Sequence, residues 1–136
     1  MAIRIKWDGA MEFTATNELG ASVKMDTGPA YGGSGKYPTP MELLLMSLGG
    51  CTGMDVVAIL EKMRIKLTKF EIEIESKRRE HVPRYYESIH IIYVLSGEGL
   101  TQKKAKRAVE LSKQKYCSVS IMLQEKAKIT YEIRIE

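Results

Sequence analysis

Apolar and polar residues alternate along the first part of the chain, which is the pattern of β-strands. The alternation covers residues 2–7, 11–15 and 21–26. Asp8-Gly9 is a typical hairpin turn sequence, and residues 17–20 supply a second turn. We therefore predict three antiparallel strands before any helix.

The pattern then changes to a long apolar segment that is typical of a helix. Thr39 suits the N-cap, Pro40 suits the first helical position, and Glu42 completes a capping box with Thr39. We predict that this helix runs to about Met63. Because it is apolar nearly all round, we expect it to lie in the middle of the fold.

The second half of the chain returns to alternation, interrupted by one amphipathic segment. It predicts strands over 67–78, 85–95 and 128–135, and a helix that Thr101 caps and that ends near Gln114. The element order is βββ-α-ββ-α-β. This order predicts a single α+β domain, residues 1–136, in which antiparallel sheets pack around the central apolar helix.

Composition narrows the function classes. The chain has 136 residues, 28% of them charged, and a formal net charge of +4. It lacks a basic stretch with interleaved aromatic residues, so nucleic-acid binding is not expected. The N-terminus has no apolar signal core, and the charge-free apolar run, residues 43–54, is too short to span a bilayer. We expect a cytoplasmic protein without membrane contact, whose thiols stay reduced.

Two cysteines have surroundings that suggest chemistry. Cys51 follows a Gly-Gly pair in the most hydrophobic stretch, and Cys117 stands at the break between two amphipathic patterns. Two interpretations are open: inert buried cysteines that act as small hydrophobic residues, or a nucleophile with a resolving partner. His81 and His90 lie far from each other and from both cysteines, so no metal site is predicted. No phosphate-binding or dinucleotide-binding fingerprint is present, and no cofactor is expected.

The sequence resembles the osmotically induced protein C and organic hydroperoxide resistance (OsmC/Ohr) superfamily. The matching stretches run from Pro40 to Cys51, from Ser76 to Arg84 and from Lys115 to Val119. They look most like the subgroup of uncharacterised bacterial OsmC-like members. The resemblance implies an OsmC-like fold and an intertwined homodimer with active sites at the subunit boundary.

The resemblance also implies a chemistry for the cysteines. Peroxidases of the family reduce organic hydroperoxides at the position that Cys51 matches, and Cys117 matches their resolving cysteine. The family chemistry also uses a Glu directly after the helix-opening proline, and an Arg in the N-terminal half. Here Met41 follows Pro40, the carboxylate comes one place later as Glu42, and no arginine lies between Arg4 and Arg64.

A cysteine attacks a peroxide as its thiolate, so Cys51 needs a nearby cation or donor. The candidates are Arg78, Arg79 and Arg84, where two strands meet, and Lys36 on the glycine-rich loop. The alternative for Arg78 and Arg79 is a solvated hairpin end. For Glu42, the capping role is favoured over a catalytic one.

Two functions follow from these residues. The first is an enzyme, a cysteine-based thiol peroxidase of peroxiredoxin type that takes part in the oxidative stress response. It reduces an organic hydroperoxide with electrons from an external dithiol. The alternative is a non-catalytic OsmC-like protein that holds an apolar or thiol-containing small molecule in a reactive thiol pocket. Retention of both cysteines favours the enzyme, whereas the absent Arg and the shifted Glu favour the binding protein.

Overall fold

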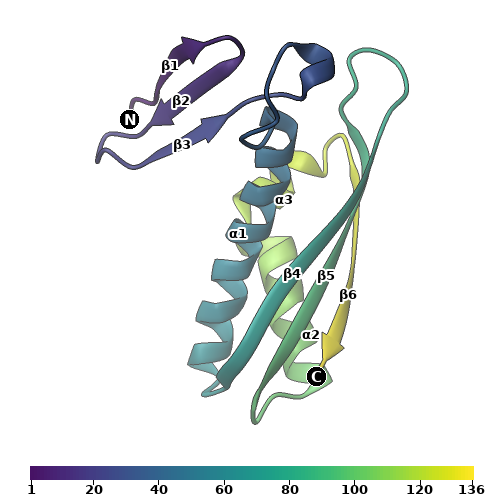
Figure 1. Ribbon diagram of the computed structural model, residues 1–136. Coiled ribbons are helices and arrows are strands. Elements are labelled where there is room, and N and C mark those ends of the chain that lie inside the picture. The colour runs from purple at the N-terminus through teal and green to yellow at the C-terminus, as the bar shows by residue number, and fades with distance from the viewer. The chain divides into compact units, whose positions relative to one another are not determined.

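The structure is a computed structural model that describes residues 1–136. The chain forms two compact units, Met1–Leu45 and Met46–Glu136, which are described one at a time (Figure 1). The sequence predicted one domain over 1–136, and this boundary falls within the long helix of that domain.

The first unit begins with a three-stranded antiparallel sheet, as predicted. Its strands are β1 (Arg4–Gly9), β2 (Glu12–Thr16) and β3 (Ser22–Met25), in the order β1-β2-β3. Directly opposed residues share a face of a sheet. The pairs Ile5↔Ala15↔Val23 and Trp7↔Phe13↔Met25 therefore place the apolar side chains of all three strands on one face.

A buried carboxylate organises the glycine-rich loop that follows β3. Asp26 accepts hydrogen bonds from the Thr27 amide (2.7 Å) and from both the hydroxyl (2.6 Å) and the amide (3.2 Å) of Ser34. These donors, the Ser34 hydroxyl first, lower the pKa of Asp26 below its ordinary value. Gly33 sits inside this turn, where a Cβ would lie 2.0 Å from the Thr27 carbonyl oxygen. The loop, which includes the short 3-10 turn η1 (Pro29–Tyr31), is therefore held in one conformation by hydrogen bonds to Asp26.

Helix α1 (Pro40–Lys62) has the bounds that the sequence indicated. Its buried side chains form one stripe at four-residue spacing: Leu48, Thr52, Val56 and Leu60. The expected burial all round is wrong for the single chain, because other large apolar residues of the helix, such as Met46 and Met54, stay exposed. One face of this helix is buried, and the opposite apolar face is exposed.

By length and composition alone, α1 is also long and apolar enough to cross a membrane. The charge-free run 43–54 is shorter than the helix that contains it, so the length of this run does not exclude a membrane-spanning length. The core helix of a soluble protein passes the same test, so this property identifies no membrane span by itself.

The second unit contains a mixed sheet in the order β4-β5-β6. Its strands are β4 (Lys66–Arg78), β5 (Tyr86–Glu98) and β6 (Lys128–Ile135). β4 and β5 are antiparallel, but β5 and β6 are parallel, so the expectation of purely antiparallel sheets is wrong. The reason is the long helical connection between β5 and β6, which returns the chain to the start of β5, as parallel neighbours require.

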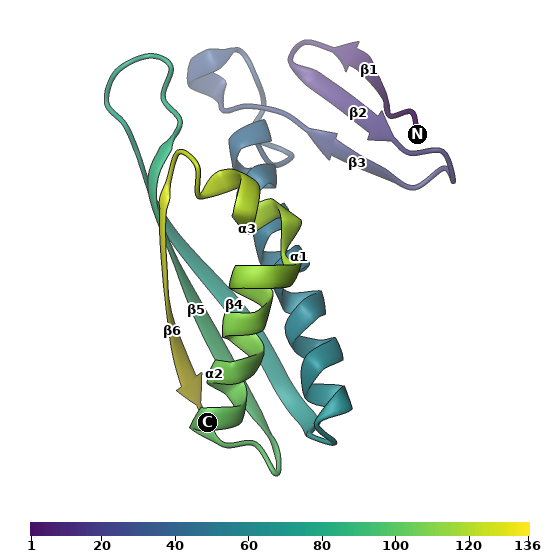
Figure 2. The same ribbon diagram turned by 180° about the vertical axis from the view of Figure 1, so that it is seen from behind.

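That connection contains three helical pieces. Helix α2 (Gln102–Leu111) has Thr101 as its N-cap, is followed by the π-helical turn η2 (Ser112–Tyr116), and leads to α3 (Ser118–Leu123). The predicted helix end at Gln114 therefore falls inside the wide turn. Figure 2 shows α2 and α3 covering the sheet of the second unit from behind the view of Figure 1. Central strand β5 is buried along most of its length.

Candidate functional site

Two glycines let α1 pack closely on β4. A Cβ on Gly49 would lie 3.3 Å from Ile74 Cδ1, and a Cβ on Gly53 would lie 3.2 Å from Ile72 Cδ1. Both approaches are tighter than most Cβ contacts, whereas a Cβ on Gly50 would meet nothing within 4 Å. Of the two glycines before Cys51, Gly49 therefore makes the close approach, and Gly53 repeats it one turn later. Cys51 lies between the two glycines.

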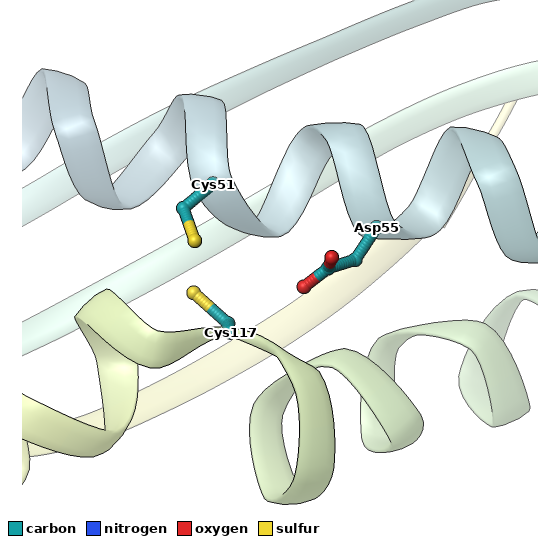
Figure 3. Close-up of side chains that lie close together, drawn as sticks. All are labelled: Cys51, Asp55 and Cys117. Atoms are coloured by element: carbon teal, nitrogen blue, oxygen red, sulfur yellow. The ribbon is translucent and has the colours of Figure 1, made fainter.

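The structure brings Cys51 and Cys117 together. Both are free thiols, and their sulfur atoms point toward each other from α1 and from the start of α3 (Figure 3). They belong to a group of three ligand atoms that all lie within 4.8 Å of one another. Cys51 is half-buried, whereas Cys117 is 0% exposed. An accessible thiol beside a buried one is the arrangement expected of a reacting and a resolving cysteine.

Backbone geometry fixes the position of Cys117. Its amide donates to the Ser112 carbonyl oxygen across the π-helical turn (2.7 Å), and its sulfur caps α3 by accepting from the Ser120 amide (3.4 Å). Burial raises the pKa of the Cys117 thiol, the hydrogen bonds from Ser120 oppose that shift, and Cys51 adds to it. Cys117 is therefore held mainly as the neutral thiol.

The third member of the group is Asp55, which the sequence analysis missed. It lies four residues after Cys51, on the same face of α1 (Figure 3). The only signal in the sequence was this spacing, because Cys117 comes close only in the folded chain.

A chain of buried hydroxyl groups holds the Asp55 carboxylate. The Ser112 hydroxyl donates to Asp55 Oδ2 (2.9 Å), Thr52 Oγ1 contacts Ser112 Oγ (2.8 Å), and Tyr93 OH contacts Thr52 Oγ1 (2.7 Å). Burial raises the pKa of Tyr93 to about 12, although the bond with Thr52 opposes the shift. The tyrosine therefore remains a neutral hydroxyl at one end of a chain that ends at a carboxylate.

The arginines that were candidates for a cation beside Cys51 make their hydrogen bonds within the β4–β5 connection. Arg78 Nε donates to the Arg84 carbonyl oxygen (2.6 Å), and Arg84 Nε donates to the Arg79 carbonyl oxygen (3.3 Å). Arg79 donates to the Tyr85 hydroxyl (2.9 Å), and its guanidinium lies 4.8 Å from the centre of that ring. These contacts match the hairpin-end alternative, because each arginine is engaged within its own connector.

Glu42 and Lys36 belong to the first unit. Glu42 accepts from the Thr39 amide (2.9 Å) while its own amide donates to Thr39 Oγ1 (3.1 Å), which is the predicted capping box. Lys36 Nζ lies 5.7 Å from the centre of the Tyr37 ring. The capping role of Glu42 is thus confirmed.

A groove of about 480 Å³ runs along the exposed face of α1 in the second unit. It is lined by Gly50, Gly53, Met54, Val57, Ala58, Glu61, Phe70 and Ile72. Apart from Glu61 the lining is apolar, and it begins at the residue next to Cys51. Cys51 itself is not among the lining residues, so the groove is an apolar surface on a neighbouring part of the same helix.

With the fold and the cysteine pair in place, comparisons with known proteins settle the family. Residues 33–132 match the OsmC-like protein family. The chain is a member of the OsmC-like family. It is also 38% identical over 136 residues to protein YhfA of Escherichia coli K12, a match that covers 99% of this chain and 98% of that protein. The resemblance stated from the sequence is confirmed.

Solved OsmC-like structures confirm the α+β architecture. A hypothetical protein from Aquifex aeolicus VF5 is 35% identical, with a TM-score of 0.82 over 99% of this chain and 96% of that one. An organic hydroperoxide resistance protein OsmC from Legionella pneumophila is 14% identical, with a TM-score of 0.70 over 98% and 97% of the two chains. The second likeness shows the shared fold.

Proposed function

We propose that this OsmC-like protein is a thiol peroxidase that reduces organic hydroperoxides with electrons from a dithiol. The observation that supports it best is the approach of Cys51 and Cys117, which are distant in sequence, to within 4.8 Å. Cys51 is the accessible thiol and would react with the peroxide, while buried Cys117 would resolve the product. The apolar groove on α1, which includes Gly50 next to Cys51 in the chain, would suit the organic part of such a substrate.

The reaction has three balanced steps. The Cys51 thiolate attacks one peroxide oxygen, the O–O bond breaks, and the leaving alkoxide takes a proton to give an alcohol and a Cys51 sulfenic acid. The Cys117 thiol then attacks the sulfenic sulfur, and water leaves as the disulfide forms. An external dithiol reduces this disulfide by two thiol–disulfide exchanges, restores both cysteines and leaves as its own disulfide.

One observation favours the alternative function, a non-catalytic protein that binds a small molecule. Asp55 lies within 4.8 Å of both sulfur atoms, and a carboxylate disfavours a second negative charge nearby. The three arginines of the β4–β5 connection make their hydrogen bonds within that connector. A thiol pair with this environment reacts slowly with peroxides and still holds a ligand.

A peroxide-consumption assay separates these two functions. The fully reduced protein is mixed with cumene hydroperoxide and dithiothreitol, and peroxide loss is followed over time. Cys51→Ser abolishes turnover, because a serine hydroxyl is too weakly acidic to attack. Without dithiothreitol, Cys117→Ser consumes one equivalent and stops with Cys51 as a sulfenic acid, whereas wild type stops as the Cys51–Cys117 disulfide. Equal rates of peroxide loss in wild type and Cys51→Ser, or no turnover in wild type, would overturn the peroxidase function and favour the binding protein.

We further propose that the protein works as a homodimer in the cytoplasm, where dithiol reductants are available. Support for the dimer comes from the apolar face of the first sheet and from α1, which leave Ile5, Trp7 and Met54 more than half exposed. Exposed apolar surface of this extent is typical of an interaction site. An interface above the roughly 2,000 Å² of obligate pairs is expected.

A further inference from the structure

The Cys51, Asp55 and Cys117 side chains have the composition and spacing of a metal-binding site. Their two sulfur atoms and one carboxylate oxygen lie within 4.8 Å of one another (Figure 3). A zinc ion in tetrahedral geometry lies about 2.3 Å from each thiolate and about 2.1 Å from a carboxylate oxygen, which places its ligands about 3.5 to 3.8 Å apart. The three groups therefore need only small side-chain adjustments to share one ion.

The backbone already holds these ligands in place. Cys51 and Asp55 project from successive turns of α1, and Cys117 is fixed from the opposite side by its bonds to Ser112 and Ser120. Two segments that are remote in sequence thus supply the donor atoms. A site of this kind is set by the fold of the second unit and does not depend on a flexible loop.

A second observation is the hydrogen bond that orients the carboxylate. Ser112 donates to Asp55 Oδ2, and Ser112 is itself joined to Thr52 and through it to Tyr93. A carboxylate has about four acceptor positions, so this bond leaves capacity for a cation. Outer-shell hydrogen bonds of this type orient metal ligands and raise their affinity.

The chemistry of the donor atoms selects the kind of ion that would fit, because the group offers two sulfur atoms and one carboxylate oxygen. Two thiolates select a borderline or soft ion such as Zn²⁺ over Mg²⁺ or Ca²⁺, which prefer oxygen ligands only.

We propose that the reduced protein binds one Zn²⁺ through Cys51, Asp55 and Cys117, with water as the fourth ligand. Binding displaces two protons, one from each thiol. A disulfide between the cysteines has no thiolate to offer, so the oxidised protein does not hold the ion. The proposal needs the reduced cysteine pair and Asp55, and it does not need peroxidase activity.

The test is a titration of the reduced, full-length protein with Co²⁺ and then Zn²⁺ in the absence of peroxide and oxygen. Co²⁺ reports its own ligands, because thiolate coordination gives an intense near-ultraviolet charge-transfer band. Tetrahedral geometry gives visible bands stronger than those of the hydrated ion. We expect saturation at one Co²⁺ per chain and displacement of the ion by one equivalent of Zn²⁺. A wild-type protein without a charge-transfer band overturns the proposal.

Variants assign the ligands. Cys51→Ser should weaken the charge-transfer band and Zn²⁺ affinity, and Asp55→Asn should lower the affinity at least tenfold while keeping the band. Glu61→Gln is the matched control, because it removes a carboxylate from an exposed position of the same helix and should bind as wild type does. Unchanged affinity in Asp55→Asn, with a wild-type circular dichroism spectrum, overturns the three-ligand site.

The proposed peroxidase and the zinc site fail separately. A protein that consumes no peroxide but shows the Co²⁺ band retains the metal site. A protein that turns over peroxide without binding Co²⁺ would overturn the metal site and support the peroxidase.

Discussion

The two sheets of this chain differ in how far their apolar side chains are buried. In β1-β2-β3 the apolar side chains gather on one face, and Ile5 and Trp7 remain 60% and 62% exposed. In β4-β5-β6 the central strand is buried along most of its length, and Ile91 is 2% exposed. The second unit thus carries its own core and the thiol pair, whereas the first unit has an apolar face that its own residues leave exposed. A sheet of this kind is typical of an interface.

The largest expected effect comes from the buried sheet. Ile91→Ala should lower the free energy of unfolding by about 2 to 5 kcal/mol, because it removes a fully packed side chain and leaves a cavity. Ile5→Ala is the matched variant on the exposed sheet. Urea unfolding at low protein concentration measures both. A loss below about 1 kcal/mol for Ile91→Ala would contradict the burial that distinguishes the two sheets.

The second prediction concerns what covers the first sheet. Ile5→Asp places a charge on the apolar face and should shift the protein from dimer to monomer in sedimentation equilibrium. Ser22→Asp adds the same charge to the opposite face, because Ser22 neighbours Val23 on the strand, and should leave the mass unchanged. Wild-type protein that sediments as a monomer at micromolar concentration would show that this sheet is uncovered in solution.

A smaller effect is expected inside the second unit, from its chain of hydroxyl groups. Tyr93→Phe keeps the ring that stacks on Phe70 and removes the hydroxyl that contacts Thr52, at a cost of about 1 to 3 kcal/mol.

The pH dependence of this contribution follows from the raised pKa of Tyr93, about 12 in the folded protein. An unfolded tyrosine ionises near pH 10. The stabilisation is therefore full below about pH 10 and is lost as the pH rises through about 12. Urea midpoints between pH 9 and 11.5 should fall more steeply for wild type than for Tyr93→Phe. Parallel curves would contradict the role of Tyr93.

The smallest effect is expected in the glycine-rich loop of the first unit. Hydrogen bonds lower the pKa of Asp26 below 3.8, so its stabilisation is present above that value and is lost as the pH falls through the folded pKa. Asp26→Asn should therefore abolish part of the acid sensitivity of loop amides in hydrogen exchange. If amide protection of Thr27 and Ser34 follows the same acid profile in both proteins, Asp26 does not organise the loop.

Features that depend on neighbouring residues were predictable from the sequence. The capping box of Thr39 and Glu42 and the strand boundaries follow from local hydrogen bonding and alternation. The direction of β6 was not predictable, because strand direction depends on the path of the whole connection between β5 and β6. The π-helical turn that begins at Ser112 was not predictable either, because the residue pattern there is still that of an α-helix.

Some residues of the candidate site could likewise be found from the sequence, and others could not. Cys51 and Cys117 were selected from their sequence surroundings and received their roles through the family resemblance, and the structure places them together. Asp55 carried no motif, since its importance comes from Ser112 and Cys117, which approach it only in the folded chain. The arginines were candidates for a cation beside the thiol by residue type alone, and the alternative of a hairpin end agrees with the hydrogen bonds that they make within their own connector.

The position of Cys117 in the connection between β5 and β6 has a consequence for the order of events during synthesis. Cys51 leaves the ribosome with α1, long before the segment that carries Cys117 and before β6, whose Ile129 carbonyl oxygen accepts from Lys113 of that segment. Domains begin to fold from the N-terminal side as the chain emerges. The nascent chain therefore carries a lone Cys51 thiol until the β5–β6 connection has emerged. A chain that stops before β6 contains every proposed ligand and both cysteines, yet lacks the strand that holds Lys113 of their connection.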